Sequence, residues 1–261
     1  MILRPKGFER RSPAGLILPP RSKQRGLITP ALLGVVGSRS RVVTDPYYAN
    51  VSLLLHLNSG QNTGIIDNSA NAYSPATSSI ATSATQSKFG GASGSFVGGG
   101  IYASYTSTTP LDLTTGDWTI EAQVYFNSTT GNQTITVKST STGFYPWLLW
   151  KNGTSHKFEA YFYDTTNTLI GSIVGTTVAT TGTWYGLQLR RSGNTFALAV
   201  NGSQEGSITS SASLRTNSSD PVWIGGFGGN SSTFNGYLDE YRMTKGVART
   251  FAAQTAEFPN S

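Results

Sequence analysis

The chain has 261 residues, no cysteine, two histidines and a formal net charge of +6. The lack of cysteine excludes disulfides, thiolate metal sites and a cysteine nucleophile. The length allows a sizeable core, and the positive charge would indicate nucleic acid only if it covered a folded surface.

The positive charge is confined to the start of the chain. Residues 1–44 contain nine Lys or Arg against one acid, a net charge of +8, whereas residues 45–261 contain ten against twelve, a net charge of −2. Five of the eleven prolines also precede residue 45, and proline disfavours long helices and central strands. We therefore predict an extended basic N-terminal arm, residues 1–44, followed by one folded domain, residues 45–261.

The arm contains an apolar stretch from Leu27 to Gly37 after a basic region, an order also found in signal peptides. Pro30 interrupts the stretch and Arg39 and Arg41 follow it, so we favour an arm that docks on other subunits. A tail packed on its own domain is the alternative. We expect assembly contacts from ten residues of the arm: Arg4, Arg10, Arg11, Leu16, Ile17, Leu18, Arg21, Arg25, Leu32 and Leu33.

Two partner classes are disfavoured. The apolar stretch is far shorter than the ~20 apolar residues that a membrane span requires, so no membrane contact is expected. The domain is slightly acidic and its aromatic residues are not interleaved with Lys or Arg, which argues against nucleic acid.

From Tyr47 onward, apolar residues alternate with a period of two, which is typical of β-strands. In Trp118–Phe126, every second residue from Trp118 is apolar, and Phe196–Val200 behaves alike. Turn signals at Asn152-Gly153, Arg191–Asn194 and Asn201-Gly202 predict hairpins. Further strands are expected at Ser52–Leu57, Phe89–Val97, Thr134–Lys138, Tyr145–Lys151, His156–Tyr163, Thr168–Val174, Thr183–Arg190, Ser203–Ile208, Val222–Gly226 and Phe234–Met243. The pattern predicts an all-β, two-sheet sandwich.

Several strings then occur in a specific order: SLLLHLN (Ser52–Asn58), QSKFGGAS (Gln86–Ser93), DWTIEAQVYF (Asp117–Phe126), GTWYGLQLRRSGNTFALAVNG (Gly182–Gly202), VWIGG (Val222–Gly226) and FNGYLDEYRMTKGVAR (Phe234–Arg249). Together they resemble the concanavalin A-like, laminin-G-like jelly-roll domains of tailed-phage virion proteins. The resemblance covers about residues 47–259 and implies a two-sheet jelly-roll sandwich. The arm lies outside it.

The resemblance implies a non-enzymatic structural protein located in the virion. Its arm would dock to capsid or tail subunits, and its jelly roll would be displayed as a decoration or fibre module. Edge strands of such a sandwich invite subunit packing, so a homo-oligomer is expected. The alternative is a glycan-binding adhesin or receptor-binding module of the tail, which would contact a host surface glycan.

Catalytic patterns are missing from the sequence. Glycoside hydrolysis normally needs two carboxyl groups about 5–10 Å apart, and hydrolases that share this sandwich carry an E-x-D-x-x-E run. Glu121 and Glu159 stand alone, while Asp239 and Glu240 are adjacent and thus expected on opposite faces of a strand. His56 and His156 are expected to be structural. We predict no enzyme activity and no cofactor.

A metal site is also not predicted. Related domains often carry acids in the segment corresponding to Phe96–Tyr102, in a pattern like F-D-G-x-G-D-Y, where they support structure or calcium. Val97 and Ile101 stand at those places here, and Ca²⁺ needs several oxygen ligands. Asp239 remains at the family's D-E position, where it could help bind a metal or accept hydrogen bonds from loop amides.

Aromatic residues leave glycan contact open, because an aromatic face stacks on a sugar ring while polar groups orient it. Five aromatic residues lie on one expected hairpin, and two more border a loop rich in Gly, Ser and Asn. The candidate contacts are Tyr145, Trp147, Tyr163, Phe227 and Phe234. The competing interpretation is that most of these rings fill the core.

Overall fold

The computed structural model describes residues 43–59, 65–97, 100–139, 145–217, 219–226 and 232–261. The described strands belong to one compact unit, Val43–Ser261. Two short 3-10 helices, η1 (Tyr48–Asn50) and η2 (Thr109–Leu111), accompany the strands. None of the helices in these ranges is long and apolar enough to cross a membrane.

Two antiparallel sheets form the domain. Sheet A has eight strands: β1 (Val51–Leu55), β3 (Ala81–Ser83), β4 (Ser93–Ser95), β6 (Trp118–Phe126), β11 (Trp184–Ser192), β12 (Thr195–Val200), β13 (Ser203–Thr209) and β15 (Gly236–Lys245). Sheet B has seven: β2 (Thr77–Ser78), β5 (Ala103–Tyr105), β7 (Gln133–Lys138), β8 (Trp147–Lys151), β9 (Lys157–Tyr163), β10 (Leu169–Val178) and β14 (Val222–Ile224). The all-β sandwich predicted from the sequence is confirmed.

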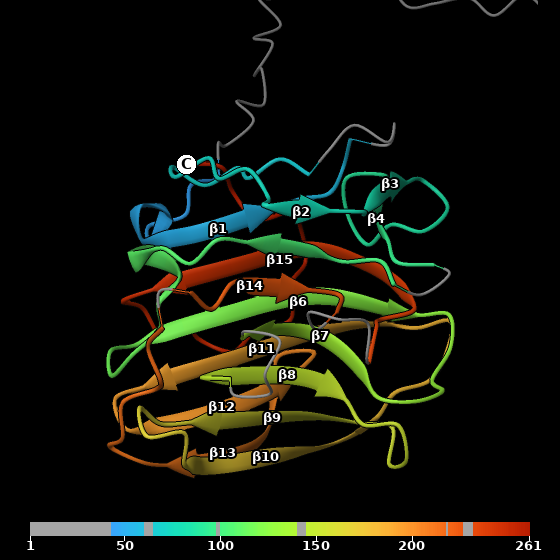
Figure 1. The fold of residues 1–261 in the computed structure, drawn as a ribbon. Coiled ribbons are helices and arrows are strands. Elements are labelled where there is room, and N and C mark those ends of the chain that lie inside the picture. The colour runs from blue at the N-terminus through green and yellow to red at the C-terminus, as the bar shows by residue number, and fades with distance from the viewer. Residues whose placement is uncertain (1–42, 60–64, 98–99, 140–144, 218, 227–231) are drawn as a thin grey trace, which may run out of the picture. The chain divides into compact units, whose positions relative to one another are not determined.

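The strand orders are β13-β12-β11-β6-β15-β4-β3 in sheet A, where β1 also pairs with β15, and β10-β9-β8-β7-β14-β5-β2 in sheet B. Figure 1 shows that the two sheets have matching ends: β1 and β2 lie at one end of the sandwich, and β13 and β10 lie at the other. At that last end, Glu205 of β13 accepts hydrogen bonds from the amides of Thr176 and Thr177 in β10. The two sheets are therefore tied together where the core ends.

The core lies between the sheets and takes the inward residues of each strand. In β6 these are Trp118, Ile120, Ala122, Val124 and Phe126, all at most 2% exposed. The alternation read from the sequence is thus confirmed for this central strand, which pairs with β11 on one side and β15 on the other. Its other face points away from the core toward the C-terminal segment.

The conformations of several turns depend on residues that tolerate left-handed φ values. Asn201 and Gly202 have φ values of 51° and 81°, which is the left-handed pair that a two-residue hairpin turn requires. The hairpin predicted at Asn152-Gly153 forms between β8 and β9, but its loop runs on to His156. The strand expected over Phe89–Val97 shortens to β4 because Gly90 and Gly91 adopt left-handed φ values of 61° and 83°.

A β-bulge in β15 corrects the expected placement of Asp239 and Glu240. Leu238 and Tyr241 both point into the core, so two residues instead of one lie between inward positions. The register against β6 shifts here, and Glu240 has a left-handed φ of 53°. A bulge of this kind adds one residue to one strand of a pair. Both carboxylates therefore lie on the outer side of sheet A, not on opposite faces.

Candidate functional site

The predicted assembly contacts cannot be placed, because all of them lie outside the described residues. The same holds for one predicted glycan contact, Phe227. The four other predicted contacts are described, and the fold separates them into two pairs.

Trp147 and Phe234 are not surface residues, which corrects their prediction as glycan contacts. Both side chains are fully buried in the core. Phe234 packs edge-on against Phe96 and Phe126, with ring centroids 5.3 and 5.2 Å apart. These rings fill the space between the sheets, where burial of a large aromatic side chain stabilises the fold most. A ring enclosed in this way offers no face to a sugar.

Tyr145 and Tyr163, in contrast, are only partly buried and contact each other. Their ring centroids are 5.0 Å apart and the planes are nearly perpendicular, at 79°. Burial raises the pKa of the Tyr145 phenol, and the neighbouring Tyr163 raises it further. The Tyr145 phenol therefore stays neutral.

Next to this pair, Trp150 and Tyr161 form a second edge-to-face contact on the outer face of sheet B, with centroids 5.8 Å apart. One carboxylate holds both rings: Glu159 Oε2 accepts from Trp150 Nε1 at 3.2 Å and from the Tyr161 hydroxyl at 3.0 Å. We call Tyr145, Trp150, Glu159, Tyr161 and Tyr163 the sheet-B aromatic cluster. Its rings are oriented before any ligand arrives.

The cluster continues sideways across sheet B through residues that face each other on neighbouring strands. Leu148 of β8 is paired with Tyr161 on one side and Val137 of β7 on the other, and Val137 is paired with Trp223 of β14. Trp223 is partly exposed and packs edge-on against Tyr102, at 5.3 Å. Because strands lie about 4.8 Å apart, two partly exposed aromatic pairs lie on either side of the buried Leu148 and Val137 side chains.

The sequence contained a signal for this cluster that the prediction did not use. Glu159, Tyr161 and Tyr163 alternate along β9, so an acid shares a face with two aromatic residues. An acid at such a position indicates the outward face of a strand. The same register places Trp150 outward, opposite Glu159.

The outer face of sheet A is covered by the last residues of the chain, 247–261, which we call the C-terminal strap. Backbone amides of the strap donate to side chains of the sheet: Arg249 to Thr119 Oγ1 at 2.9 Å, Ala252 to Gln188 Oε1 at 3.0 Å and Phe258 to Glu240 Oε2 at 2.6 Å. The strap is therefore held by outward side chains of β6, β11 and β15.

A buried ion network anchors the strap further. Arg242 donates to Glu121 Oε2 from Nε at 2.7 Å and to Asp45 Oδ2 from Nη1 at 3.0 Å. Arg249 of the strap donates two more hydrogen bonds to Asp45, from Nη1 to Oδ1 at 3.0 Å and from Nη2 to Oδ2 at 2.6 Å. Burial alone would raise the pKa of Asp45, but the hydrogen bond and charge of Arg249 and the charge of Arg242 outweigh it, so the pKa is lowered.

His56, which follows β1, ties the end of the strap to the bulge. Its Nδ1 lies 2.6 Å from Glu240 Oε1 and its Nε2 lies 2.6 Å from Asn260 Oδ1. Both partners accept, an arrangement that suits a doubly protonated ring. Burial lowers the pKa of His56, but the hydrogen bonds to Glu240 and Asn260 outweigh it and the net shift is upward.

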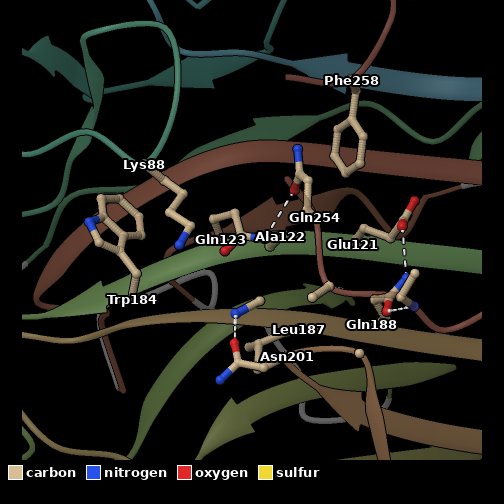
Figure 2. Close-up of a pocket in the computed structure, with 14 residues that line it drawn as sticks. Lys88, Glu121, Ala122, Gln123, Trp184, Leu187, Gln188, Asn201, Gln254 and Phe258 are labelled. Atoms are coloured by element: carbon tan, nitrogen blue, oxygen red, sulfur yellow. Dashed lines mark hydrogen bonds between the residues drawn. The ribbon is translucent and has the colours of Figure 1, made fainter. Parts of the chain in front are cut away.

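A pocket of about 270 Å³ lies between sheet A and the strap. Figure 2 shows Trp184 and Lys88 at one end with Gln123 beside them, Gln254 farther along toward Phe258, and Asn201 below. Gln123 Nε2 donates to Gln254 Oε1 at 3.0 Å, which joins the sheet to the strap. We call this cavity the strap pocket. Sequence reasoning missed it because its walls come from segments far apart in the chain.

The four carboxylates considered for catalysis from the sequence, Glu121, Glu159, Asp239 and Glu240, do not form a hydrolytic pair. Glu121 is bound by Arg242 on sheet A, whereas Glu159 lies on sheet B, so they do not flank one bond. Asp239 and Glu240 are fully buried. Across the described ranges there is no group of three His, Cys, Asp or Glu that could hold a metal ion. Asp239 Oδ2 instead accepts from the amides of Lys88 and Phe89, at 2.8 and 3.0 Å.

Comparison with solved structures gives the same fold at low identity. The binding domain of Paraclostridial Mosquitocidal Protein 1 has a TM-score of 0.59 at 12% identity, with 80% of this chain and 50% of that chain covered. Domain 4 of AbnA, a GH43 extracellular arabinanase from Geobacillus stearothermophilus, in complex with arabinotriose, has a TM-score of 0.56 at 14% identity, with 77% and 94% covered.

A third similar structure is the botulinum neurotoxin serotype D ligand binding domain in complex with N-acetylneuraminic acid. Its TM-score is 0.55 at 9% identity, with 80% of this chain and 50% of that chain covered. The chain thus spans about half the length of these two binding domains. At these identities the likeness concerns the fold.

No curated protein matches the chain in sequence. A family model does: residues 98–250, more than half of the chain, match the model described as the concanavalin A-like lectin/glucanases superfamily. The match runs from before β5 to the start of the strap and includes β6, β11 and β15 of sheet A. The chain therefore belongs to the concanavalin A-like lectin/glucanase superfamily.

Proposed function

We propose that the domain is a non-catalytic glycan-binding module and that the sheet-B aromatic cluster contacts the glycan. The observation that carries this proposal is the pair Trp150 and Tyr161, held by Glu159 on an outer sheet face. Two solved domains of similar fold, from the arabinanase and the serotype D neurotoxin, are described in complexes with carbohydrates, which supports the same class of ligand.

The cluster suits an oligosaccharide more than a single small molecule. Apolar faces of sugar rings stack on aromatic rings, and a phenol oxygen that donates its hydrogen to Glu159 can still accept a hydrogen bond from a sugar hydroxyl. The two aromatic pairs of sheet B, with Leu148 and Val137 between them, offer more than one stacking position along one line. Because Glu159 fixes Trp150 and Tyr161 in advance, little side-chain entropy is lost on binding.

Replacing Trp150 by alanine tests this proposal. The full chain should bind a subset of glycans on an array, and Trp150→Ala should weaken that binding by about 30-fold, or about 2 kcal/mol, the usual cost of truncating a central aromatic contact. The matched control is Tyr48→Ala, a partly buried aromatic residue of η1 that belongs neither to the sheet-B aromatic cluster nor to the wall of the strap pocket. Equal losses in both variants, or unchanged binding in Trp150→Ala, would contradict the assignment.

A second role, as a structural component of a tailed-phage virion, is favoured by the sequence of the arm. The +8 arm on a −2 domain suits attachment to acidic capsid or tail subunits, with the jelly roll displayed outward and the chain assembled as a homo-oligomer. An array without any bound glycan would favour this decoration role over the adhesin role.

Deletion of residues 1–42 tests the docking role. The remaining chain keeps the whole compact unit, Val43–Ser261, including Asp45 and its ion pairs. We expect it to unfold at the temperature of the full chain but to be missing from assembled particles, as measured by denaturing gels of purified particles. Normal incorporation of the truncated chain would refute the docking of the arm.

A further inference from the structure

The strap pocket is a preformed cavity rather than a gap between loose segments. Gly202 lies so close to the strap that a Cβ there would come within 2.3 Å of the Ala253 amide nitrogen. Gly186 leaves room for the Gln123 side chain, whose Nε2 would lie 2.8 Å from a Cβ. Together with the bonds from Ala252 and Gln254 to the sheet, these contacts set the width of the cavity.

Several polar groups around the pocket have hydrogen-bonding capacity to spare. Within the described ranges, Lys88 Nζ has no ion pair or hydrogen bond, only the Phe89 ring with its centroid 5.8 Å away. Asn201 Oδ1 accepts a hydrogen bond from the Gly186 amide at 2.8 Å. Its Nδ2 has no hydrogen-bond partner among these residues. Gln123 Oε1 and Trp184 Nε1 have no partner among these residues either. One cation, two donors and one acceptor thus belong to residues that line the cavity.

The negative charge of the pocket wall is already neutralised. Glu121 is bound by Arg242 at 2.5 Å and by Gln188 Nε2 at 3.0 Å. Both polar atoms of the Gln188 side chain have partners: Nε2 donates to Glu121, and Oε1 accepts from the Ala252 amide. The Lys88 ammonium is therefore the uncompensated charge at this pocket, and a ligand with one carboxylate would complement it.

We propose that the strap pocket binds a single carboxylated sugar residue, such as a hexuronic acid. The carboxylate pairs with Lys88, the hydroxyls pair with the free groups of Gln123 and Asn201, and the ring lies against Trp184. The Trp184 indole packs against the Tyr125 ring, with the two ring centroids 5.5 Å apart. At about 270 Å³, the cavity lies below the usual ~300–1,000 Å³ of drug-sized sites, which suits one ring.

The test is a titration of the full chain with sodium glucuronate and, as its neutral match, glucose, followed by calorimetry and by saturation-transfer NMR. We expect saturable binding of glucuronate in the millimolar range, about tenfold weaker binding of glucose, and the same tenfold loss for glucuronate in Lys88→Gln. The Lys88 side chain is exposed, so this variant should keep its unfolding temperature.

The matched control is Trp150→Ala, which removes a ring of the sheet-B aromatic cluster and leaves the strap pocket intact. Since the inference does not depend on that cluster, glucuronate binding should survive in this variant even if array binding is lost. Equal affinities for glucuronate and glucose, loss of glucuronate binding in Trp150→Ala, or no saturation up to roughly 50 mM glucuronate would overturn the proposal.

Discussion

Replacing Arg242 by methionine is expected to destabilise the domain by about 3–5 kcal/mol, the usual cost of removing one partner of a buried ion pair. Arg242 is 6% exposed and is bonded to both Glu121 and Asp45. Asp45 would keep its two bonds to Arg249, but Glu121 would keep only Gln188 and a distant Arg249 at 3.8 Å. The unfolding free energy from urea titration at pH 7 measures the loss.

The double variant Arg242→Met with Glu121→Gln separates charge from packing. The guanidinium also lies 3.6 Å above the Phe258 ring, and methionine keeps part of that apolar contact. Since glutamine removes the uncompensated charge, we expect the double variant to recover about half of the loss. A double variant no more stable than Arg242→Met would show that the ion network is not what matters at this position.

Replacing Asp239 by asparagine is expected to make the domain more stable at high pH. The pKa of Asp239 is raised to about 7: burial is the largest cause, the amides of Phe89 and Lys88 counteract it in part, and the charge of Glu240 adds to it. The ordinary value is 3.8. Because the folded-state pKa is the higher one, its stabilising contribution is fully present below about pH 4 and is lost as the pH rises through 7.

Three pH units correspond to about 4 kcal/mol, an upper bound for the effect. Asparagine keeps a carbonyl oxygen for the amides of Lys88 and Phe89 but cannot ionise. We therefore expect its advantage over the unaltered chain to grow by about 3 kcal/mol between pH 4 and pH 8, as measured by urea unfolding at a series of pH values. A difference independent of pH would contradict this account.

An exposed acid with the opposite shift provides the control. Hydrogen bonds from the Thr166 side chain and the Thr168 amide lower the pKa of Asp164. Its contribution is therefore present above the ordinary pKa and lost as the pH falls through the lowered value. Asp164→Asn should consequently lose stability relative to the unaltered chain at pH 8 and match it at low pH, the reverse of the trend for Asp239→Asn.

Much of the fold could be predicted from local pattern. The alternation in Trp118–Phe126 identified β6 and its inward face, and Asn201-Gly202 identified a two-residue turn. Both signals can be read within a few residues. A strand points successive side chains to opposite faces, and this turn requires residues that tolerate left-handed φ values. The domain's place in its superfamily followed from several such segments in order.

Other features were decided only by tertiary structure. The bulge in β15 moves Glu240 to the side of Asp239, and the sequence has no mark for the extra residue. Trp147 and Tyr163 looked equivalent as aromatic residues of one hairpin, yet Trp147 is in the core and Tyr163 on the outer face. Which face of a strand meets the second sheet depends on partners elsewhere in the chain.

The sequence by itself determined the class of fold, the central strands, the tight turn at Asn201-Gly202 and the concentration of positive charge before residue 45. Only the tertiary structure decided which aromatic residues remain accessible and that the strap closes a pocket over sheet A. The ion network joins Asp45 to residues about 200 positions away. Such contacts arise when distant segments pack together, so no local spacing of residues encodes them.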